Sequence, residues 1–559
     1  MNCFYAPFLK KFAITLAGFP LMIRFEKKTK NIKNVQDALL AQIISNNKST
    51  RFGKEHNFSF ITNYEQYKAY VPVRDYENHR PYIEKMTKGE DNVLVSGKPF
   101  FYNTTSGTTD KPKFIPVTKE SFKAYGKIST LWFYNVLKDN PGIFNGFSLS
   151  VVAPALDGTV EDGTPYGSIS GVSYKKIPAL LKKTYSVPYP VICIRDYQKK
   201  YYGLALGALA RNITYIICPS PSNLIQINRT IVENFDDIVN DIRCGTIRQD
   251  VLDEIPEEHR NETRSFFGKP DKKRADELVS LKKKYGSNLT FKHYWKNLSC
   301  INCWKLGNFR RLIPQIELLV DKKTKIRAFG YQASEARVGI VVDNFLDTSV
   351  LLPEYYFYEF IRVEDWDKED PPIYRAHELE SGVRYYIIIT NNSGLYRYNI
   401  NDIVEVKGFY NRTPRIIFVQ KGEGITSITG EKLSEEQIII AMDGIKKSIG
   451  IENYHMICDE KNFLYKLFVE FSKNCSPEKK EKTIPLLDSR LKELNLEYEV
   501  KRKSGRLKQP VLVEMVEDSY LIIKETMIKN GLAKEGQFKD CFLSKNIATH
   551  SIYETVRIK

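Results

Sequence analysis

Hydroxyl side chains gather around one glycine in the segment 101–116, FYNTTSGTTDKPKFIP, and are the first feature of the chain that could do chemistry. They include Thr105, Ser106 and Thr108, which flank Gly107, and lysines follow soon after. Hydroxyls and backbone amides donate hydrogen bonds to phosphate oxygens, and a glycine lets the backbone approach closely. The segment lacks the GxxxxGK[ST] pattern of a Walker A loop. It predicts a phosphate-binding loop of another kind, although a plain surface turn has a similar composition.

A tyrosine and a glutamate, Tyr331 and Glu335, lie in the small-residue segment 330–339, GYQASEARVG. A carboxylate beside a phosphate site suits Mg²⁺, which proteins hold with one or two carboxylates plus substrate phosphates. An aromatic ring next to it can stack on a nucleotide base. Taken alone, the segment is equally well explained as a loop that leads into a helix at Ser334.

Two further motifs follow towards the C-terminus. Residues 394–402, GLYRYNIND, place Arg397 and Asp402 near the end of an expected strand. An aspartate there can accept two hydrogen bonds from a ribose diol, or it can cap its own turn. Residues 430–434, GEKLS, carry Lys432 beyond an expected linker. A lysine on a small mobile domain can be brought to a phosphate, and an ordinary surface lysine is the alternative.

The elements that must position these residues fall into two parts. Apolar spacing predicts a helix over 35–50, and apolar runs between Gly, Pro and polar turns predict buried strands over 146–220. Short strands separated by Asn, Gly and Pro follow over 382–419. The next stretch, 421–432, is rich in Gly and Thr and is expected to be a linker.

The C-terminal part is predicted to be a compact α+β unit. Ser434 and Gln437 form a capping-box pattern ahead of a helix that ends near Ser448. The further elements expected are strands at about 454–458, 464–472, 498–503 and 510–516 and helices near 478–494 and 520–530. The predicted division is a large domain over 1–424, a hinge over 425–432 and a small domain over 433–559.

The composition is that of a globular protein, with 559 residues of which 42% are hydrophobic and 27% charged. The net charge of +17 favours an anionic partner, such as a nucleotide, a phosphate, a nucleic acid or a membrane surface, without choosing among them. The cysteines number nine, and only Cys300 and Cys303 are closely spaced, without a second pair to complete a zinc site. A reduced, cytoplasmic chain is therefore expected.

The N-terminus contains an apolar stretch from Phe12 to Ile23. Its length fits the core of a signal peptide, but no small-x-small cleavage site follows it. We therefore expect an amphipathic or buried first helix, broken at Pro20. Because no window of about 18 to 20 apolar residues occurs, no transmembrane segment is expected.

The order and spacing of the four motifs carry a resemblance to a known family. The Thr/Ser-rich loop, Tyr-x-x-Ser-Glu, Tyr-Arg-Tyr-x-x-x-Asp and Gly-Glu-Lys-Leu-Ser-Glu follow one another along the chain. The chain resembles the auxin-responsive Gretchen Hagen family of acyl-acid amido synthetases, in its bacterial-type form, within the adenylate-forming superfamily that includes firefly luciferase. Segments 49–56 and 64–81 are also similar to this family. Each motif alone is weakly specific, whereas four in order, followed by a short C-terminal domain, are strongly so.

The resemblance implies an α/β fold with a large N-terminal domain of β-sheets and a β-barrel flanked by helices, and a small mobile α+β domain. It implies a ligase that uses ATP and Mg²⁺ to adenylate a carboxylic acid and then transfers the acyl group to an amine, such as an amino acid. An acyl-CoA-type ligase with a thiol acceptor and a nucleotide-binding member without catalysis are the alternatives. A monomer without a nucleic-acid partner is expected.

The resemblance also assigns roles to matching residues. Thr105, Ser106, Gly107 and Thr108 match the loop that binds phosphate. Tyr331 matches a residue near adenine, and Glu335 one near Mg²⁺ and phosphate. Asp402 matches the carboxylate that binds ribose, with Arg397 in the same motif, and Lys432 matches the lysine that contacts the α-phosphate.

Some positions depart from the family pattern, and the acyl pocket is harder to predict. Asp110 stands close to the expected polyphosphate site, where its charge is unfavourable, and Asn399 and Asn401 stand where plant members usually have Arg and Gly. Asn401 can still adopt a left-handed conformation. Residues from about 120–240 and 300–350 are expected to line the acyl pocket, with Trp132, Phe133, Phe309 and Phe329 as candidates that could equally be core.

Overall fold

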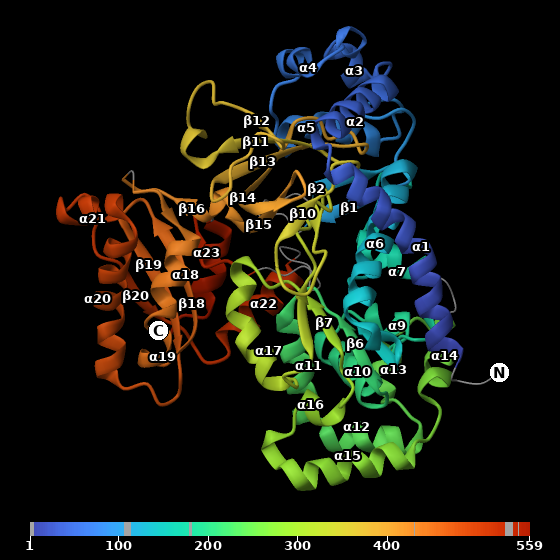
Figure 1. Ribbon diagram of the computed structural model, residues 1–559. Coiled ribbons are helices and arrows are strands. Elements are labelled where there is room, and N and C mark those ends of the chain that lie inside the picture. Colours follow the sequence, from blue (N-terminus) through green and yellow to red (C-terminus); the bar gives the residue numbers. More distant parts are fainter. Residues whose placement is uncertain are drawn as a thin grey trace.

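The computed structural model of the chain describes residues 5–105, 113–177, 182–429, 431–530, 540–545 and 547–558. It consists of a large part, coloured blue to light orange, and a smaller C-terminal part, coloured darker orange to red, which lies beside it (Figure 1). The two parts have separate hydrophobic cores. The expected mixed α/β architecture is confirmed.

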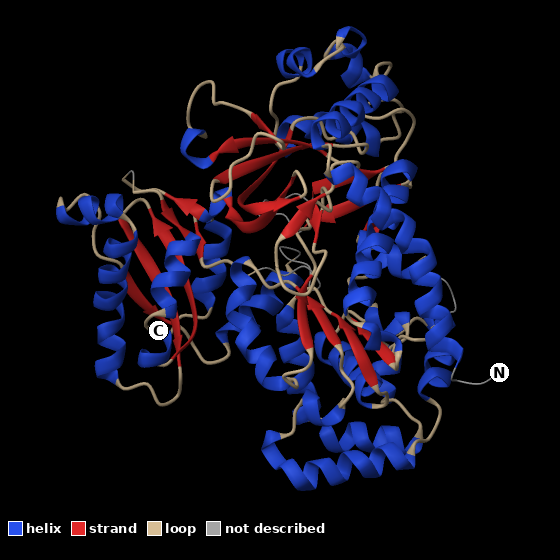
Figure 2. Ribbon diagram, in the orientation of Figure 1, coloured by secondary structure: helices blue, strands red, loops and turns tan. Residues whose placement is uncertain are grey.

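A parallel sheet with helices on both faces forms one half of the large part (Figure 2). Its strand order is β3-β6-β7-β8. Strands covered on both faces are apolar along their whole length, and β6, with the sequence ITYII, is an example. The elements are β3 (Phe147–Ser150), β6 (Ile213–Ile217), β7 (Cys300–Cys303) and β8 (Lys325–Ala328), with α10 (Tyr197–Leu209), α11 (Pro221–Glu233) and α15 (Lys272–Tyr285) among the surrounding helices.

Two largely antiparallel sheets form the other half. The larger has the order β12-β11-β13-β14-β15-β10-β9, and the smaller the order β2-β1-β5-β4. The larger sheet contains the long strand β14 (Tyr398–Tyr410), which replaces the separate short strands expected from the sequence. Within it, Asn401 has a φ of 60°, the left-handed conformation that we expected it could adopt. The other strands are β1 (Phe101–Thr105), β2 (Lys113–Val117), β4 (Gly158–Thr159), β5 (Pro165–Gly167), β9 (Gly339–Ile340), β10 (Ser349–Leu351), β11 (Phe357–Arg362), β12 (Tyr374–Arg375), β13 (Arg384–Thr390) and β15 (Thr413–Lys421).

The N-terminal residues form one long helix, α1 (Tyr5–Thr29), which packs along α6 (Lys119–Asp139). The expected first helix is confirmed, but the expected break at Pro20 is wrong. Proline removes the hydrogen bond to the carbonyl four residues earlier and its ring crowds that carbonyl. That residue, Leu16, is exposed, so water can reach the freed carbonyl, and packing along α6 keeps the helix continuous. The helix α2 (Ile32–Asn47) follows. No helix in the described ranges is long and apolar enough to cross a membrane.

The smaller part is a four-stranded sheet in the order β20-β19-β18-β21, covered by helices. The capping box of Ser434 and Gln437 is confirmed. The strand expected over 498–503 is wrong, because helix α21 (Leu496–Lys503) begins there with the Asn495 side chain accepting from the amide of Tyr498. The elements are β16 (Ile425–Thr426), β17 (Leu433–Ser434), α18 (Glu435–Asp443), α19 (Lys446–Ile449), β18 (Ile451–Asp459), β19 (Leu464–Phe471), α20 (Pro477–Leu494), β20 (Val511–Glu514), α22 (Ser519–Lys529), β21 (Leu543–Ser544) and α23 (Ile547–Thr555).

Candidate active site

A cleft of about 1040 Å³ lies between the two parts and receives side chains from both. That volume is sufficient for a nucleotide and a second small molecule together. Its walls come from the loop over 330–337, the start of β14, the first turns of α6 and the C-terminal segment 540–545. Lining residues with polar side chains include Asn103, Lys113, Ser121, Ser168, Lys305, Tyr331, Glu335, Arg337, Tyr398, Asp402, Lys421, Glu435, His455, Ser544 and Lys545.

Asp402 lies in this cleft between two partners. Its carboxylate accepts a hydrogen bond of 2.5 Å from the Tyr331 hydroxyl and pairs with the Lys421 ammonium at 2.5 Å. The antiparallel register places Asp402 opposite Lys421, so β14 and β15 together determine this pair. Burial and the adjacent carboxylate raise the pKa of Tyr331, which therefore remains a hydrogen-bond donor. A carboxylate has about four acceptor positions, so Asp402 can still accept bonds from a ligand.

Glu335 lies in the same cleft, on the loop that also carries Tyr331. The Tyr398 hydroxyl donates a 3.3 Å hydrogen bond to its carboxylate, and the Asn391 amide donates a 3.2 Å bond to its carbonyl. Burial and the charge of Glu335 raise the pKa of Tyr398, so this hydroxyl is protonated at neutral pH. The segment is a loop throughout and does not lead into a helix at Ser334. The structure thus brings the second and third motifs together.

The Thr/Ser-rich motif begins at the edge of the cleft. Thr105 is the last residue of β1, and Ser106, Gly107 and Thr108 lie outside the described residues. The strand is joined to the cleft wall through Asn103, whose side chain donates to the Ser334 carbonyl (2.8 Å) and accepts from the Ile169 amide (3.0 Å). This contact positions the start of the motif beside the loop that carries Glu335.

Arg397 does not line the cleft. Its guanidinium is 3% exposed and forms an ion pair of 3.0 Å with Glu359, which is 1% exposed. It also donates to the carbonyls of Lys68 and Val71, and the backbone of Arg397 has a φ of 45°. The side chain therefore holds α4 (Tyr64–Tyr70) against the sheet rather than pointing at the other motif residues.

Lys432 also lies outside the cleft in this structure. Its ammonium forms an ion pair with Asp367, and both side chains are 67% exposed. The neighbouring Glu431 is buried, and its carboxylate accepts from the amides of Ile428 and Thr429 and from the Tyr465 hydroxyl. These bonds fix the loop that carries Lys432 to the core of the smaller part.

Only some of the expected acyl-pocket residues line the cleft. Phe309 and Phe329 do, whereas Trp132 and Phe133 do not and pack in the core beneath it. Trp132 stacks against Phe329 at 5.2 Å between ring centroids. Arg337, which was not among the candidates predicted from the sequence, also lines the wall.

The smaller part contributes His455 to the opposite wall. Its Nδ1 donates to the Cys541 carbonyl (2.5 Å), and its Nε2 lies 3.0 Å from the Ser544 hydroxyl. Burial lowers the pKa of His455 to about 4, so the imidazole is neutral at neutral pH. The described residues contain no group of three or more His, Cys, Asp or Glu side chains that could hold a metal ion by themselves. Cys300 and Cys303 are therefore not part of such a group; both are buried and neither forms a disulfide.

Lys421, Tyr398, Asn103 and Arg337 were missed as candidates in the sequence. The partners of Asp402 and Glu335 come from neighbouring strands and loops, so only the strand register reveals them. The one available signal for Arg337 was its position two residues beyond Glu335.

A solved structure with the same architecture identifies the class of fold. An acyl acid amido synthetase, AtGH3.15 in complex with 2,4-DB, superposes with a TM-score of 0.83 at 20% identity, over 96% of each chain. Profiles of the GH3 family match most of the sequence: the N-terminal domain over residues 21–325, the central domain over 349–421 and the C-terminal domain over 436–547. The chain belongs to the GH3 family, and the family expected from the motifs is confirmed.

Curated relatives are ligases of the expected type. The probable indole-3-acetic acid-amido synthetase GH3.11 of Oryza sativa subsp. japonica is 24% identical over 463 residues, covering 79% of this chain and 77% of the relative. The jasmonoyl–L-amino acid synthetase JAR4 of Nicotiana attenuata is 24% identical over 451 residues, covering 78% and 77%. Both names describe the formation of an amide from an acid.

Proposed function

We propose that the chain is an ATP-dependent acyl-acid amido synthetase. The observation that carries this proposal is that Asp402, Tyr331 and Glu335, from motifs far apart in the sequence, meet in one cleft of about 1040 Å³ in a GH3-family fold. ATP and a carboxylic acid are the first substrates, and an amino acid is the amine acceptor. The curated relatives, a probable indole-3-acetic acid-amido synthetase and a jasmonoyl–L-amino acid synthetase, support this assignment.

In the first half-reaction a substrate carboxylate oxygen attacks the α-phosphorus of ATP. The bond from the α-phosphorus to the bridging oxygen breaks, pyrophosphate leaves with the electron pair, and the acyl-adenylate forms. Asp402 accepts from the ribose hydroxyls, and Tyr331 contacts the adenine. The motif that begins at Thr105 (Ser106, Gly107 and Thr108) binds the phosphates. Positioning and charge neutralisation are sufficient for such a displacement.

Glu335 is the residue that would hold Mg²⁺. A single carboxylate suits this ion, which takes its remaining ligands from water and substrate phosphates. The Tyr398 hydroxyl orients the Glu335 carboxylate from one side. When bound, the ion supplies positive charge to the phosphate oxygens.

In the second half-reaction the amine nitrogen attacks the acyl carbonyl carbon. The bond to the AMP oxygen breaks, AMP leaves with the electron pair, and the amine gives up a proton. We propose that the segment 425–432 is the hinge between a domain over 1–424 and one over 433–559. Rotation of the smaller domain about this hinge moves Lys432 from Asp367 to the α-phosphate. The pairing of β16 with β17 and the bonds of Glu431 fasten Lys432 to the smaller part, so a rotation of that part would carry the lysine with it.

We further propose that the chain acts as a monomer in the cytoplasm. The described cysteines are all free thiols, which suits a reducing compartment.

ATP–pyrophosphate exchange with purified protein, Mg²⁺ and a panel of carboxylic acids tests the proposal. Exchange stimulated by particular acids, followed by amide formation with amino acids, is the expected result. Product formed with coenzyme A in place of an amino acid would favour the thiol-acceptor ligase. ATP binding without exchange for any acid would favour the non-catalytic alternative.

A further inference from the structure

A buried arginine without a carboxylate partner lines the cleft. Arg337 is 5% exposed, and in the described part of the chain no Asp or Glu lies within ion-pair distance of it. The charged or ionisable groups that face it are the phenols of Tyr125, Tyr356 and Tyr215. A buried cation is costly unless an anion compensates it.

Neutral neighbours hold this guanidinium in place. Nη1 donates to the Ser129 hydroxyl at 3.0 Å, and the Gln332 amide oxygen, in the orientation that satisfies both groups, accepts from Nε (3.1 Å) and Nη2 (3.2 Å). The Trp132 ring lies 5.1 Å from its carbon Cζ. A guanidinium has five N–H donors, so these three bonds leave two for a ligand.

The acid substrate is the molecule that this part of the cleft must accept. Tyr125, Ser129 and Trp132 lie at helical spacing on one face of α6, and that face also brings Ser121 and Phe122 to the cleft. Aromatic side chains are frequent in the wall, which also carries a few hydroxyls and, besides Arg337, a lysine (Lys305) that is already paired with Asp347. Such a wall favours an apolar body with one charged group at a defined position.

We propose that Arg337 binds a second anionic group on the acid substrate, so that the preferred substrate is a dicarboxylic acid or an acid with another anionic substituent. This inference rests on the proposed function. The reacting carboxylate is a poor partner, because it loses its charge when the adenylate forms and an ion pair would weaken it as a nucleophile. A second anionic group keeps its charge in substrate, intermediate and product.

The test compares acids matched in size in ATP–pyrophosphate exchange: hexanoate with adipate, and 4-methylbenzoate with terephthalate. We expect the wild-type enzyme to prefer the dianions. Arg337→Gln should raise KM for the dianions roughly 10- to 100-fold, the range of a charge-assisted hydrogen bond, and leave the monoacids nearly unchanged. Arg211→Gln is the matched control, because that guanidinium is also partly buried on aromatic rings, Phe147 and Phe266, but does not line the cleft.

A direct measurement separates this inference from the proposed function. Thermal stabilisation by the same dianions without ATP should be present in the wild type and in Arg211→Gln and absent in Arg337→Gln. Exchange that favours monoacids, with equal rates in Arg337→Gln, would overturn the inference and leave the proposed function intact. Stabilisation that depends on Arg337 without exchange for any acid would support the anion site and count against the ligase.

A second surface stands apart from the cleft. Five apolar residues of α1 are 52–66% exposed and are spaced three or four residues apart, so they form a stripe along one side of the helix. We call this the α1 stripe. It consists of Phe8, Phe12, Leu16, Phe19 and Ile23.

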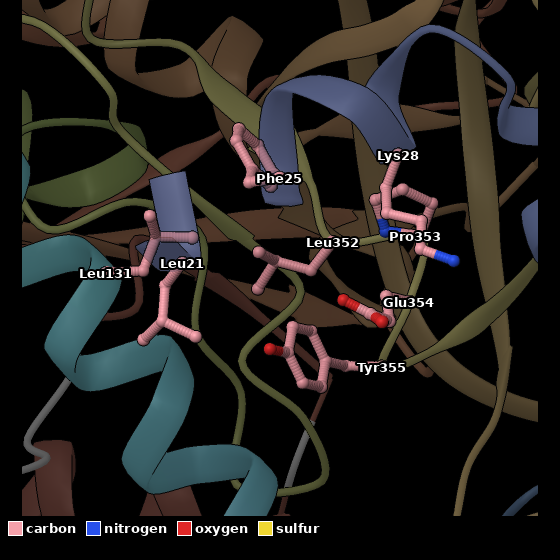
Figure 3. Close-up of a pocket in the computed structure, with 8 residues that line it drawn as sticks. All are labelled: Leu21, Phe25, Lys28, Leu131, Leu352, Pro353, Glu354 and Tyr355. Atoms are coloured by element: carbon pink, nitrogen blue, oxygen red, sulfur yellow. The ribbon is translucent and has the colours of Figure 1, made fainter. Parts of the chain in front are cut away.

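The opposite side of α1 is already packed. Figure 3 shows Leu21 and Phe25 of α1 facing Leu131 of α6 and Leu352. The gap that these residues surround is only about 10 Å³. Phe19 also contacts Tyr134 of α6, with 6.4 Å between ring centroids, but its side chain remains 52% exposed. The α1 stripe is therefore largely a second apolar face, distinct from the one that packs on α6.

Basic residues stand at the two ends of this stripe. Between residues 5 and 30 the sequence has six lysines and arginines, against Glu26 as the one acidic residue, and the whole chain has a net charge of +17. Lys10 is buried and Arg24 pairs with Glu354, so the free charge lies mainly at the C-terminal end of α1, on Lys27, Lys28 and Lys30. An apolar stripe flanked by basic residues is typical of helices that lie in the surface of an anionic membrane. We infer that α1 binds reversibly to such a surface through the α1 stripe.

Sedimentation with vesicles tests this inference. We expect binding to vesicles with one quarter phosphatidylserine, weaker binding to pure phosphatidylcholine, and loss on raising the salt concentration. Phe12→Glu with Leu16→Glu should abolish binding, while Phe345→Glu, at a 90% exposed phenylalanine outside α1, should not. Concentration-dependent dimerisation without vesicle binding would overturn the inference in favour of a second copy of the chain.

Discussion

Replacing Lys432 by alanine tests the proposed hinge movement. In this structure the ammonium is paired with Asp367 outside the cleft, and both side chains are 67% exposed. Lys432→Ala removes the charge that the hinge is proposed to deliver to the α-phosphate. Asp367→Asn is its matched control, because it breaks the same ion pair and leaves the lysine intact.

The expected magnitudes separate the two roles of Lys432. An exposed ion pair contributes about 0 to 1 kcal/mol, so neither variant should lower the free energy of unfolding by more than about 1 kcal/mol. Loss of a preorganised charge costs roughly 10²-fold or more in rate, or about 3 kcal/mol in activation free energy. Asp367→Asn should match the wild-type rate or exceed it by up to about fivefold, because it releases the lysine.

The assay is the rate of acyl-adenylate formation in a single turnover, measured by quenching the reaction of excess enzyme with ATP and acid, with urea unfolding of each variant alongside. A Lys432→Ala enzyme that forms the adenylate at the wild-type rate would refute the role. So would an Asp367→Asn enzyme as slow as Lys432→Ala, because the ion pair would then account for the effect.

Three further predictions concern the cleft and its supports. Asp402→Asn should raise KM for ATP roughly tenfold or more through loss of charge-assisted bonds; initial rates at varied ATP check this, and an unchanged KM would contradict it. Arg397→Ala leaves Glu359 buried without its charged partner and should lower the free energy of unfolding by about 3 to 5 kcal/mol. Urea unfolding measures this, and a change below about 1 kcal/mol would count against the prediction. Burial lowers the pKa of His79 and His455 to about 4, so the unfolded chain binds more protons and stability should fall as pH drops from about 6.5 towards 4. The loss is about 2 kcal/mol per histidine at pH 5, and His79→Phe should reduce it.

Periodic and capped elements could be predicted from the sequence, whereas ambiguous ones could not. The helix α20 and the capping box at Ser434 follow from local patterns. The stretch 496–501, LEYEVK, overlaps the strand expected over 498–503 and alternates apolar and charged residues as a strand does. Ion pairs of Lys501 with Glu497 and Lys503 with Glu499, four residues apart, favour the helix instead.

The candidate site could be predicted only where a motif carries its own geometry. Tyr331 and Glu335 share one loop, so their presence in a common site follows from their spacing. Arg397 was grouped with Asp402 because both belong to one motif. Its side chain instead meets Glu359 on another strand, a contact that depends on how β11 and β13 pair. The pairing of Lys421 with Asp402 likewise depends on the register between β14 and β15, which the sequence does not reveal.

The distribution of charge explains why the proposed reaction needs a moving domain. At the proposed nucleoside end, Lys421 already neutralises Asp402, so this carboxylate would not repel the phosphates strongly. At the proposed phosphate end, Glu335 adds negative charge until a cation offsets it. Lys432 lies outside the cleft, paired with Asp367, and does not contribute charge there. On the proposed function, adenylation is therefore about 10²-fold faster once the hinge brings Lys432 in, and its return to Asp367 frees the cleft for the amine.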